Sequence, residues 1–211
     1  SFYTLASRSN PSNFMTRTSW DSAFYLKPYN ADDIQKAVFK AIDNQNGTWS
    51  FTIEKTETDD EGIENVNTYY VGIPFGYDNL NANISWQVAW TVEEGEYPGF
   101  YKIKAGEGQG NTMTIGGYLH LNAGNQYAVI NESTNSWFPD YYGGVQMDEY
   151  DYPVTDETGL FPIPLNTISQ NWAFIDASLD LASYNVKVQL YQLLQDIEDN
   201  NLGDEMFNEG F

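Results

Sequence analysis

The stretch from Val88 to Leu121 decides the fold. It contains three short runs, Val88-Ala-Trp-Thr-Val92, Phe100-Tyr-Lys-Ile-Lys104 and Gly117-Tyr-Leu-His-Leu121. Each run is rich in aromatic and β-branched residues, and the segments between the runs are rich in Gly, Pro, Asn and Glu. Apolar runs separated by turn-forming residues are typical of half-buried antiparallel strands. The stretch therefore predicts three strands and the turns that join them.

The same pattern recurs elsewhere in the chain. Phe39 corresponds to Trp90 and Gly47 to Gly99, at a spacing of about 50 residues, which is typical of a repeated supersecondary unit. A third copy is split between the start of the chain and Gln170-Asn-Trp-Ala-Phe-Ile175 near its end. The sequence thus predicts three copies of one unit.

Four strands are expected in each copy. They are Phe2–Ala6, Phe14–Arg17, Phe24–Leu26 and Val38–Ile42, then Trp49–Ile53, Tyr69–Ile73, Asn81–Trp86 and Val88–Val92, and finally Phe100–Lys104, Tyr118–Leu121, Tyr127–Ile130 and Trp172–Ile175. One such unit cannot bury its apolar face, whereas three units can close a six-stranded barrel capped by three hairpins. We therefore predict an all-β protein, a β-trefoil over residues 1–176.

The remaining segments are expected to differ from this pattern. The acidic segment Glu54–Asn67 is predicted to be a solvated loop. The segment Asn131–Leu165 is rich in Tyr, Asp, Gly and Pro and is predicted to be a long insertion. Residues 177–202 carry apolar side chains at steps of three and four, which predicts a C-terminal amphipathic α-helix. Residues 203–211 are expected to form an acidic tail.

Composition and charge exclude several classes of function. The chain has 211 residues, 41% of them hydrophobic, which suffices for one domain with a buried core. Nine Lys and Arg residues against 30 Asp and Glu residues give a formal charge of −21, which disfavours nucleic acid as a partner. No apolar run is long enough for a membrane span. There is no Cys, so disulfides and thiol catalysis are excluded.

The run of aromatic strand, glycine turn, Tyr/Leu strand and final Gln170-Asn-Trp172 resembles the ricin B-type lectin or family-13-like carbohydrate-binding β-trefoil. The resemblance covers residues 1 to 176. The corresponding positions in the other copies, Val88-Ala-Trp90 and Ala37-Val-Phe39, lack the Gln. A β-trefoil followed by a helix is also similar to the leading module of large secreted or surface bacterial proteins. That similarity implies a secreted or cell-surface location, with an export signal outside this sequence and the helix as a linker to a following domain.

In the lectin family, sugars bind beside an aromatic residue and a carboxylate or amide on the hairpin after the second strand. The aromatic ring stacks on the C–H face of the sugar, and the polar groups bind its hydroxyls. The matching residues are Trp20 and Asp21 in the first copy and Tyr77, Asp78 and Asn79 in the second. The alternative is that these aromatic residues cap the barrel and the Asp residues form turns.

The insertion offers a further candidate site. Trp137, Asp140, Tyr141 and Tyr142 combine aromatic rings and a carboxylate on a long loop that could hold a glycan or a surface protein. The alternative is a surface loop that packs on itself.

Catalytic and metal chemistry have weaker support. His120 is the only His, so neither a triad nor a zinc site can be assembled around it, and a structural role is expected. The acidic residues of the insertion lack the spacing of an EF-hand loop. We therefore expect a non-enzymatic carbohydrate-binding module without metal or cofactor. The alternatives are a structural or protein-interaction module, with self-association through the C-terminal helix, and a two-carboxylate hydrolase.

Overall fold

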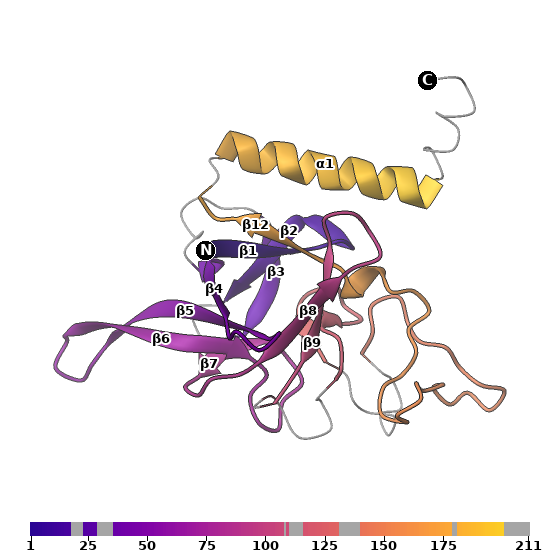
Figure 1. The fold of residues 1–211 in the computed structure, drawn as a ribbon, viewed down its shortest axis with the longest axis horizontal. Helices are drawn as coiled ribbons and strands as arrows, with labels where there is room; N and C mark the ends of the chain where they lie inside the picture. Colours follow the sequence, from indigo (N-terminus) through magenta and orange to yellow (C-terminus); the bar gives the residue numbers. More distant parts are fainter. Residues whose placement is uncertain are drawn as a thin grey trace.

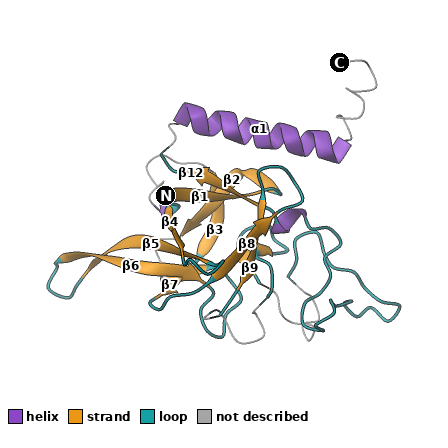
Figure 2. Cartoon of the chain, in the orientation of Figure 1, coloured by secondary structure: helices purple, strands orange, loops and turns teal. Residues whose placement is uncertain are grey.

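The structure is a computed structural model that describes residues 1–17, 23–28, 36–107, 109, 116–130, 140–178 and 181–200. These residues form twelve β-strands, a short 3-10 helix η2 (Ile168–Gln170) and one α-helix, α1 (Leu181–Asn200) (Figure 1, Figure 2). The strands are β1 (Phe2–Ser7), β2 (Asn10–Arg17), β3 (Phe24–Pro28), β4 (Phe39–Asp43), β5 (Trp49–Thr58), β6 (Glu64–Gly72), β7 (Asn81–Ile84), β8 (Trp90–Glu94), β9 (Tyr101–Ala105), β10 (His120–Leu121), β11 (Ala128–Val129) and β12 (Trp172–Asp176).

Six of the strands close a barrel. β1 pairs with β4 and β12, β5 pairs with β4 and β8, and β9 pairs with β8 and β12, always antiparallel. Each barrel strand therefore has a partner on both sides, so the ring has no open edge. The first and fourth strands of every predicted copy supply this ring, as a β-trefoil requires.

The second and third strands of each copy form three hairpins that cap one end of the barrel. They are β2–β3, β6–β7 and β10–β11. The hairpins also pair with one another, through bridges from Ala23 to Asn81 and from Asn79 to Val129. The protein is an all-β trefoil with one helix, and the three predicted copies are confirmed.

Three large aromatic side chains, at equivalent positions, fill the barrel. Phe39, Trp90 and Trp172 are the first residues of β4, β8 and β12, and all three are buried. The indole N–H of Trp90 donates to the Val71 carbonyl at 3.0 Å, and that of Trp172 donates to the Leu119 carbonyl at 2.9 Å. Both indoles are thus fully buried and hydrogen-bonded, as buried polar groups must be.

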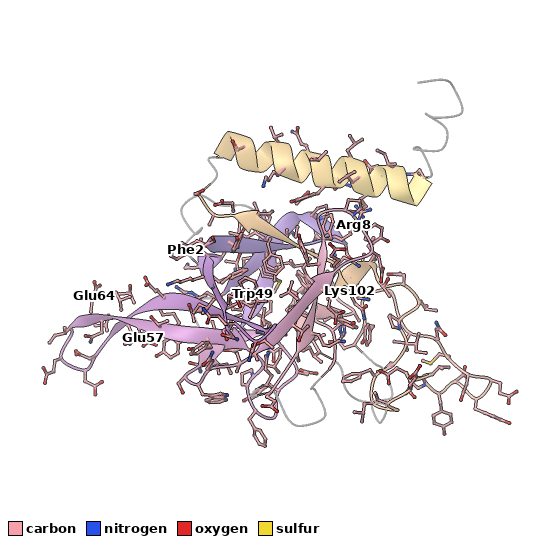
Figure 3. All side chains as sticks on the ribbon, viewed as in Figure 1. Phe2, Arg8, Trp49, Glu57, Glu64 and Lys102 are labelled. Atoms are coloured by element: carbon pink, nitrogen blue, oxygen red, sulfur yellow. The ribbon has the colours of Figure 1, made fainter. Side chains whose placement is uncertain are left out.

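The segment Glu54–Asn67 is not a loop, so that expectation is wrong. β5 and β6 continue through it and pair from Thr52–Tyr70 to Thr58–Glu64, and the hairpin projects from the barrel with Glu57 and Glu64 along it (Figure 1, Figure 3). Hydrogen bonds from Tyr69 and Asn67 lower the pKa of Glu57. Cross-strand pairs of this kind hold the ribbon together although both of its faces are exposed.

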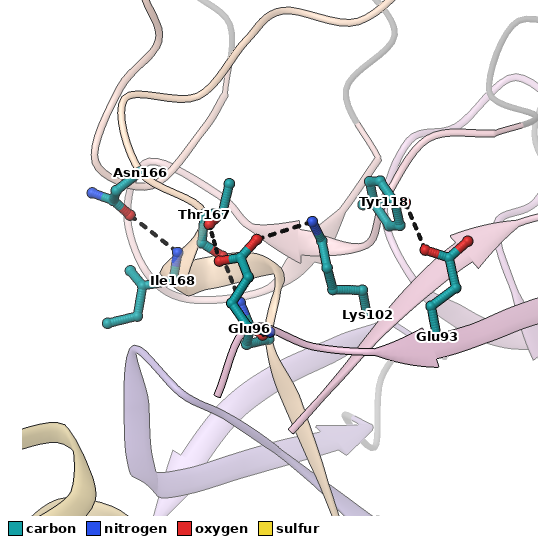
Figure 4. Close-up of polar contacts among 8 residues, drawn as sticks. Glu93, Glu96, Lys102, Tyr118, Asn166, Thr167 and Ile168 are labelled. Atoms are coloured by element: carbon teal, nitrogen blue, oxygen red, sulfur yellow. Dashed lines mark hydrogen bonds and ion pairs between the residues drawn. The ribbon is translucent and has the colours of Figure 1, made fainter. Parts of the chain in front are cut away.

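The described part of the insertion, residues 140–165, folds back on itself. Three backbone hydrogen bonds form a cycle, from Gln146 to Ile163, from Ile163 to Val154 and from Val154 to Gln146. The segment that follows the insertion is fixed to the β8–β9 turn, where Glu96 accepts hydrogen bonds from Thr167 and Lys102 (Figure 4). These contacts return the chain to β12 in register with the barrel.

The insertion also covers His120. The rings of His120 and Tyr141 stack in parallel, with centroids 3.6 Å apart, and both residues are buried. His120 Nδ1 lies 3.1 Å from the Tyr118 carbonyl, which can only accept, so Nδ1 carries the proton. Burial lowers the pKa of His120 to about 4. The imidazole is therefore neutral near pH 7.

Helix α1 packs on the outside of the barrel rather than over its open end. It covers a second apolar cluster, in which the Tyr191 ring lies 5.0 Å from that of Phe100. The buried Arg8 links the two parts, because its guanidinium donates to the Tyr191 and Leu194 carbonyls and lies 4.2 Å from the centre of the Tyr97 ring (Figure 3). The predicted helix is confirmed, although it begins later than residue 177. The predicted tail, residues 203–211, lies outside the described residues.

Replacing Trp172 by Phe tests the aromatic layer. The substitution keeps a ring in the core but leaves the Leu119 carbonyl without its donor, so we expect a loss of about 1–3 kcal/mol in the free energy of unfolding. Urea denaturation would measure it. Trp86→Phe is the matched control, since Trp86 is 47% exposed, and it should change stability by less than about 0.5 kcal/mol. Equal stabilities of the two variants would contradict the assigned role.

His120 predicts a specific pH dependence of stability. Its pKa is lowered on folding, from 6.5 to about 4, so the unfolded chain binds a proton between these values and the folded chain does not. Stability contributed by the neutral imidazole is therefore present above pH 6.5 and is lost as the pH falls towards 4, by about 3 kcal/mol.

Denaturation of the protein and of His120→Asn at pH 7 and pH 4 would measure this loss. Asn preserves a donor for the Tyr118 carbonyl but does not titrate. The variant should lose about 3 kcal/mol less than the protein over this range. Parallel pH profiles would show that His120 is not the titrating group.

Candidate functional site

The predicted site in the second copy lies on a turn at the capped end of the barrel. The Tyr77 amide donates to the Pro74 carbonyl at 3.0 Å, and Gly76 has a φ of 81°, which suits the third position of a type II turn. The turn presents Tyr77, which is 63% exposed, and its neighbour Phe75, which is 76% exposed. Two aromatic rings on one short turn therefore face solvent.

The residues that follow the turn bind to the third hairpin. Ile130 donates its amide to the Asp78 carbonyl at 2.7 Å, and Asn79 forms a bridge with Val129. The pairing fixes the backbone of Asp78 beside β11 while its side chain remains exposed, and Asn79 is half-buried. The second and third copies thus contribute to the same surface.

Tyr127 lies at the centre of this surface. Burial raises the pKa of Tyr127, and the charges of Asp140 and Asp78 raise it further. The ring also meets Tyr25 of β3 edge to face, with centroids 5.6 Å apart and an interplanar angle of 67°. The first and third hairpins are therefore in contact through these two rings.

Asp140 is held in place by the turn between β10 and β11. Its Oδ1 atom accepts the Ala123 amide at 2.8 Å, and the next residues of the insertion continue along the barrel, where the Tyr142 amide donates to the Leu121 carbonyl. Tyr142 is half-buried against the main core. These hydrogen bonds anchor the start of the described part of the insertion. The bond from Ala123 uses one of the two carboxylate oxygens of Asp140.

The structure groups some of the predicted residues and separates others. Tyr77, Asp78 and Asp140 share the capped end with Tyr25 and Tyr127, and we call these five residues the cap site. Tyr141 is buried against His120, so its ring belongs to the packing. Trp20, Asp21 and Trp137 lie outside the described residues.

Tyr25 and Tyr127 were missed by sequence reasoning. Each lies in a predicted strand, where a tyrosine reads as half-buried packing. Tyr25 and Tyr127 belong to the predicted third strands of the first and third copies, and Asp78 lies just before the third strand of the second copy. A comparison of the three copies at their third strands was therefore the available signal.

The cap site combines aromatic faces with two carboxylates. Rings can stack on the C–H face of a sugar, while the Asp78 and Asp140 carboxylates accept hydrogen bonds from its hydroxyls. The described residues contain no group of three or more His, Asp or Glu side chains arranged to hold a metal ion. Within the same residues, no helix has both the length and the apolar character that a bilayer crossing demands.

Comparisons with known proteins identify no family. No protein-family model matches the chain, and no curated protein sequence matches it. Among solved structures, the chain is similar to ThreeFoil, a designed protein with three-fold symmetry, at 12% sequence identity and a TM-score of 0.43. The match covers 83% of this chain and 98% of that one.

Proposed function

We propose that this protein is a non-catalytic carbohydrate-binding module of the ricin B-type or family-13-like kind, carried by a secreted or cell-surface bacterial protein. The observation that supports the proposal is that Tyr77 and the next residue, Asp78, are both exposed on the hairpin where such lectins bind sugar. A solvated aromatic ring gains little from folding, whereas stacking on a sugar would bury it.

The rest of the cap site fits this proposal. Tyr127 and Asp140 extend the surface beyond a single stacking ring, and both are held by the β10–β11 hairpin. A ligand that bridges Asp78 and Asp140 would contact two copies at once, which favours an oligosaccharide over a single sugar unit.

A glycan array tests the proposal. The protein is screened with and without calcium, alongside Tyr77→Ala and Asp78→Asn. We expect binding that Tyr77→Ala weakens about fivefold, because stacking of aromatic rings is worth about 1 kcal/mol beyond area burial. Tyr150→Ala is the matched control, because Tyr150 is 73% exposed and lies on the insertion, outside the cap site. Absence of binding by the folded protein to every glycan would overturn the proposal.

The second candidate function is a structural or protein-interaction module. It is favoured by the outer side of α1, where Val186, Leu190 and Leu193 are at least 50% exposed, and these residues recur at steps of four and three. Light scattering of the protein and of Leu190→Glu would test it. Concentration-dependent dimers that the variant abolishes would support self-association, and monomers in both cases would oppose it.

A further inference from the structure

The open end of the barrel holds an aromatic pocket that the proposed function does not use. The pocket has a volume of about 330 Å³, within the range of small-ligand sites. Its lining comes from all six barrel strands and consists of Tyr3, Ala41, Trp49, Phe51, Val92, Tyr101 and Phe174. Trp49 is marked on this part of the barrel in Figure 3. This end lies opposite the three hairpins that carry the cap site.

The pocket repeats the three-fold symmetry of the barrel. Tyr3 is opposite Phe39 in the strand register, Trp49 is opposite Trp90, and Tyr101 is opposite Trp172. Tyr3, Trp49 and Tyr101 therefore occupy the same position in the three copies, one layer outside the buried aromatic residues. Trp49 and Tyr101 are 36% and 38% exposed, so this outer layer is accessible.

Each of these three aromatic residues is also directly opposite an acidic residue on its second neighbouring strand. Tyr3 is opposite Asp176, Trp49 is opposite Asp43, and Tyr101 is opposite Glu94. Side chains of directly opposed residues stand on the same face of a sheet, with Cβ atoms about 5 Å apart. All three acidic residues are exposed and end their strands. Three aromatic–carboxylate pairs thus surround the mouth of the pocket.

Three of the rings that line the pocket meet at steep angles. Phe174 meets Tyr3 at 85° and Tyr101 at 70°, with centroids 6.0 and 5.8 Å apart. All three rings line the same pocket. A cation is attracted to the face of an aromatic ring, and several faces around one volume are the means by which proteins recognise quaternary ammonium groups.

The charges at the mouth favour a cation over other ligands. Asp43 accepts the Gln45 amide, and hydrogen bonds from Ser178 together with the charge of Lys187 lower the pKa of Asp176. The Glu94 side chain is exposed at the end of β8. Carboxylates around the mouth attract a cation and repel an anion. The formal charge of −21 further attracts cations to the protein.

We propose that the barrel mouth binds an organic cation, specifically an alkylated ammonium group, between Tyr3, Trp49, Tyr101 and Phe174. The aromatic faces contact the alkyl groups, and Asp43, Glu94 and Asp176 neutralise the charge from the rim. This site is distinct from the cap site and goes beyond the proposed carbohydrate binding.

Titration calorimetry with choline tests the proposal directly. The control ligand is the neutral isostere of choline, in which a tert-butyl group replaces the trimethylammonium group. Size and shape are the same, so a difference in affinity reports the charge alone. We expect choline to bind at least about tenfold more tightly than the isostere. Equal affinities, or no binding of choline by the folded protein, would overturn the proposal.

Matched variants locate the site. Trp49→Ala should weaken choline binding about tenfold, whereas Trp86→Ala, which removes another exposed indole outside the pocket, should not. Trp49→Leu, which retains apolar bulk without an aromatic face, serves if the Ala variant does not fold. Glu94→Gln should also weaken binding, whereas Glu61→Gln at the tip of the β5–β6 hairpin should not. Equal effects within either pair, or displacement of choline by neutral methyl glycosides, would contradict a cation site at the mouth.

Discussion

Closure of the six-stranded barrel is the constraint on which the rest of the structure depends. None of the three copies can bury its own apolar face, so Phe39, Trp90 and Trp172 become a core only when β1, β4, β5, β8, β9 and β12 complete the ring. Closure also separates the molecule into two ends. The second and third strands of each copy collect at the capped end, whereas the starts of β1, β5 and β9 and the ends of β4, β8 and β12 collect at the mouth. Any residue type that repeats in the three copies is therefore displayed as a ring around the axis.

The acidic residues are arranged in two different ways. Some are tied to neighbours on the outside of the barrel. Burial of Glu93 opposes its ionisation, but hydrogen bonds from Tyr118 and Lys104 outweigh this effect and lower its pKa, and Glu96 is similarly bound by Thr167 and Lys102 (Figure 4). Such partly exposed pairs contribute little to stability, but they fix the insertion and the β8–β9 turn. The acids at the mouth, by contrast, face aromatic rings across the strands. The same negative charge thus supports structure on the side of the barrel and creates an attractive potential at its open end.

The two ends of the barrel suit different ligands for a physical reason. At the cap site, rings and carboxylates lie on a surface built from turns, which is suited to an extended ligand such as an oligosaccharide. At the mouth, side chains of the barrel strands line a pocket, which is suited to a compact group. Helix α1 leaves both ends open, because Arg8 and Tyr191 hold it against the outer face of the barrel. Within the described part of the chain, the helix therefore covers neither end.

The sequence by itself determined the number of copies, the twelve strands and the C-terminal helix, because the period of the apolar residues is a local property. It failed at the β5–β6 ribbon, since strands exposed on both faces lack the alternation that marks a buried face. It placed Tyr77 and Asp78 on one turn, but the position of that turn beside the third hairpin was decided only by pairing between hairpins of different copies. No local pattern in the sequence indicated the pocket at the mouth. Trp49 and Tyr101 read as ordinary strand residues and Asp43 and Glu94 as turn residues, and only the antiparallel register, a tertiary property, brings each ring opposite a carboxylate.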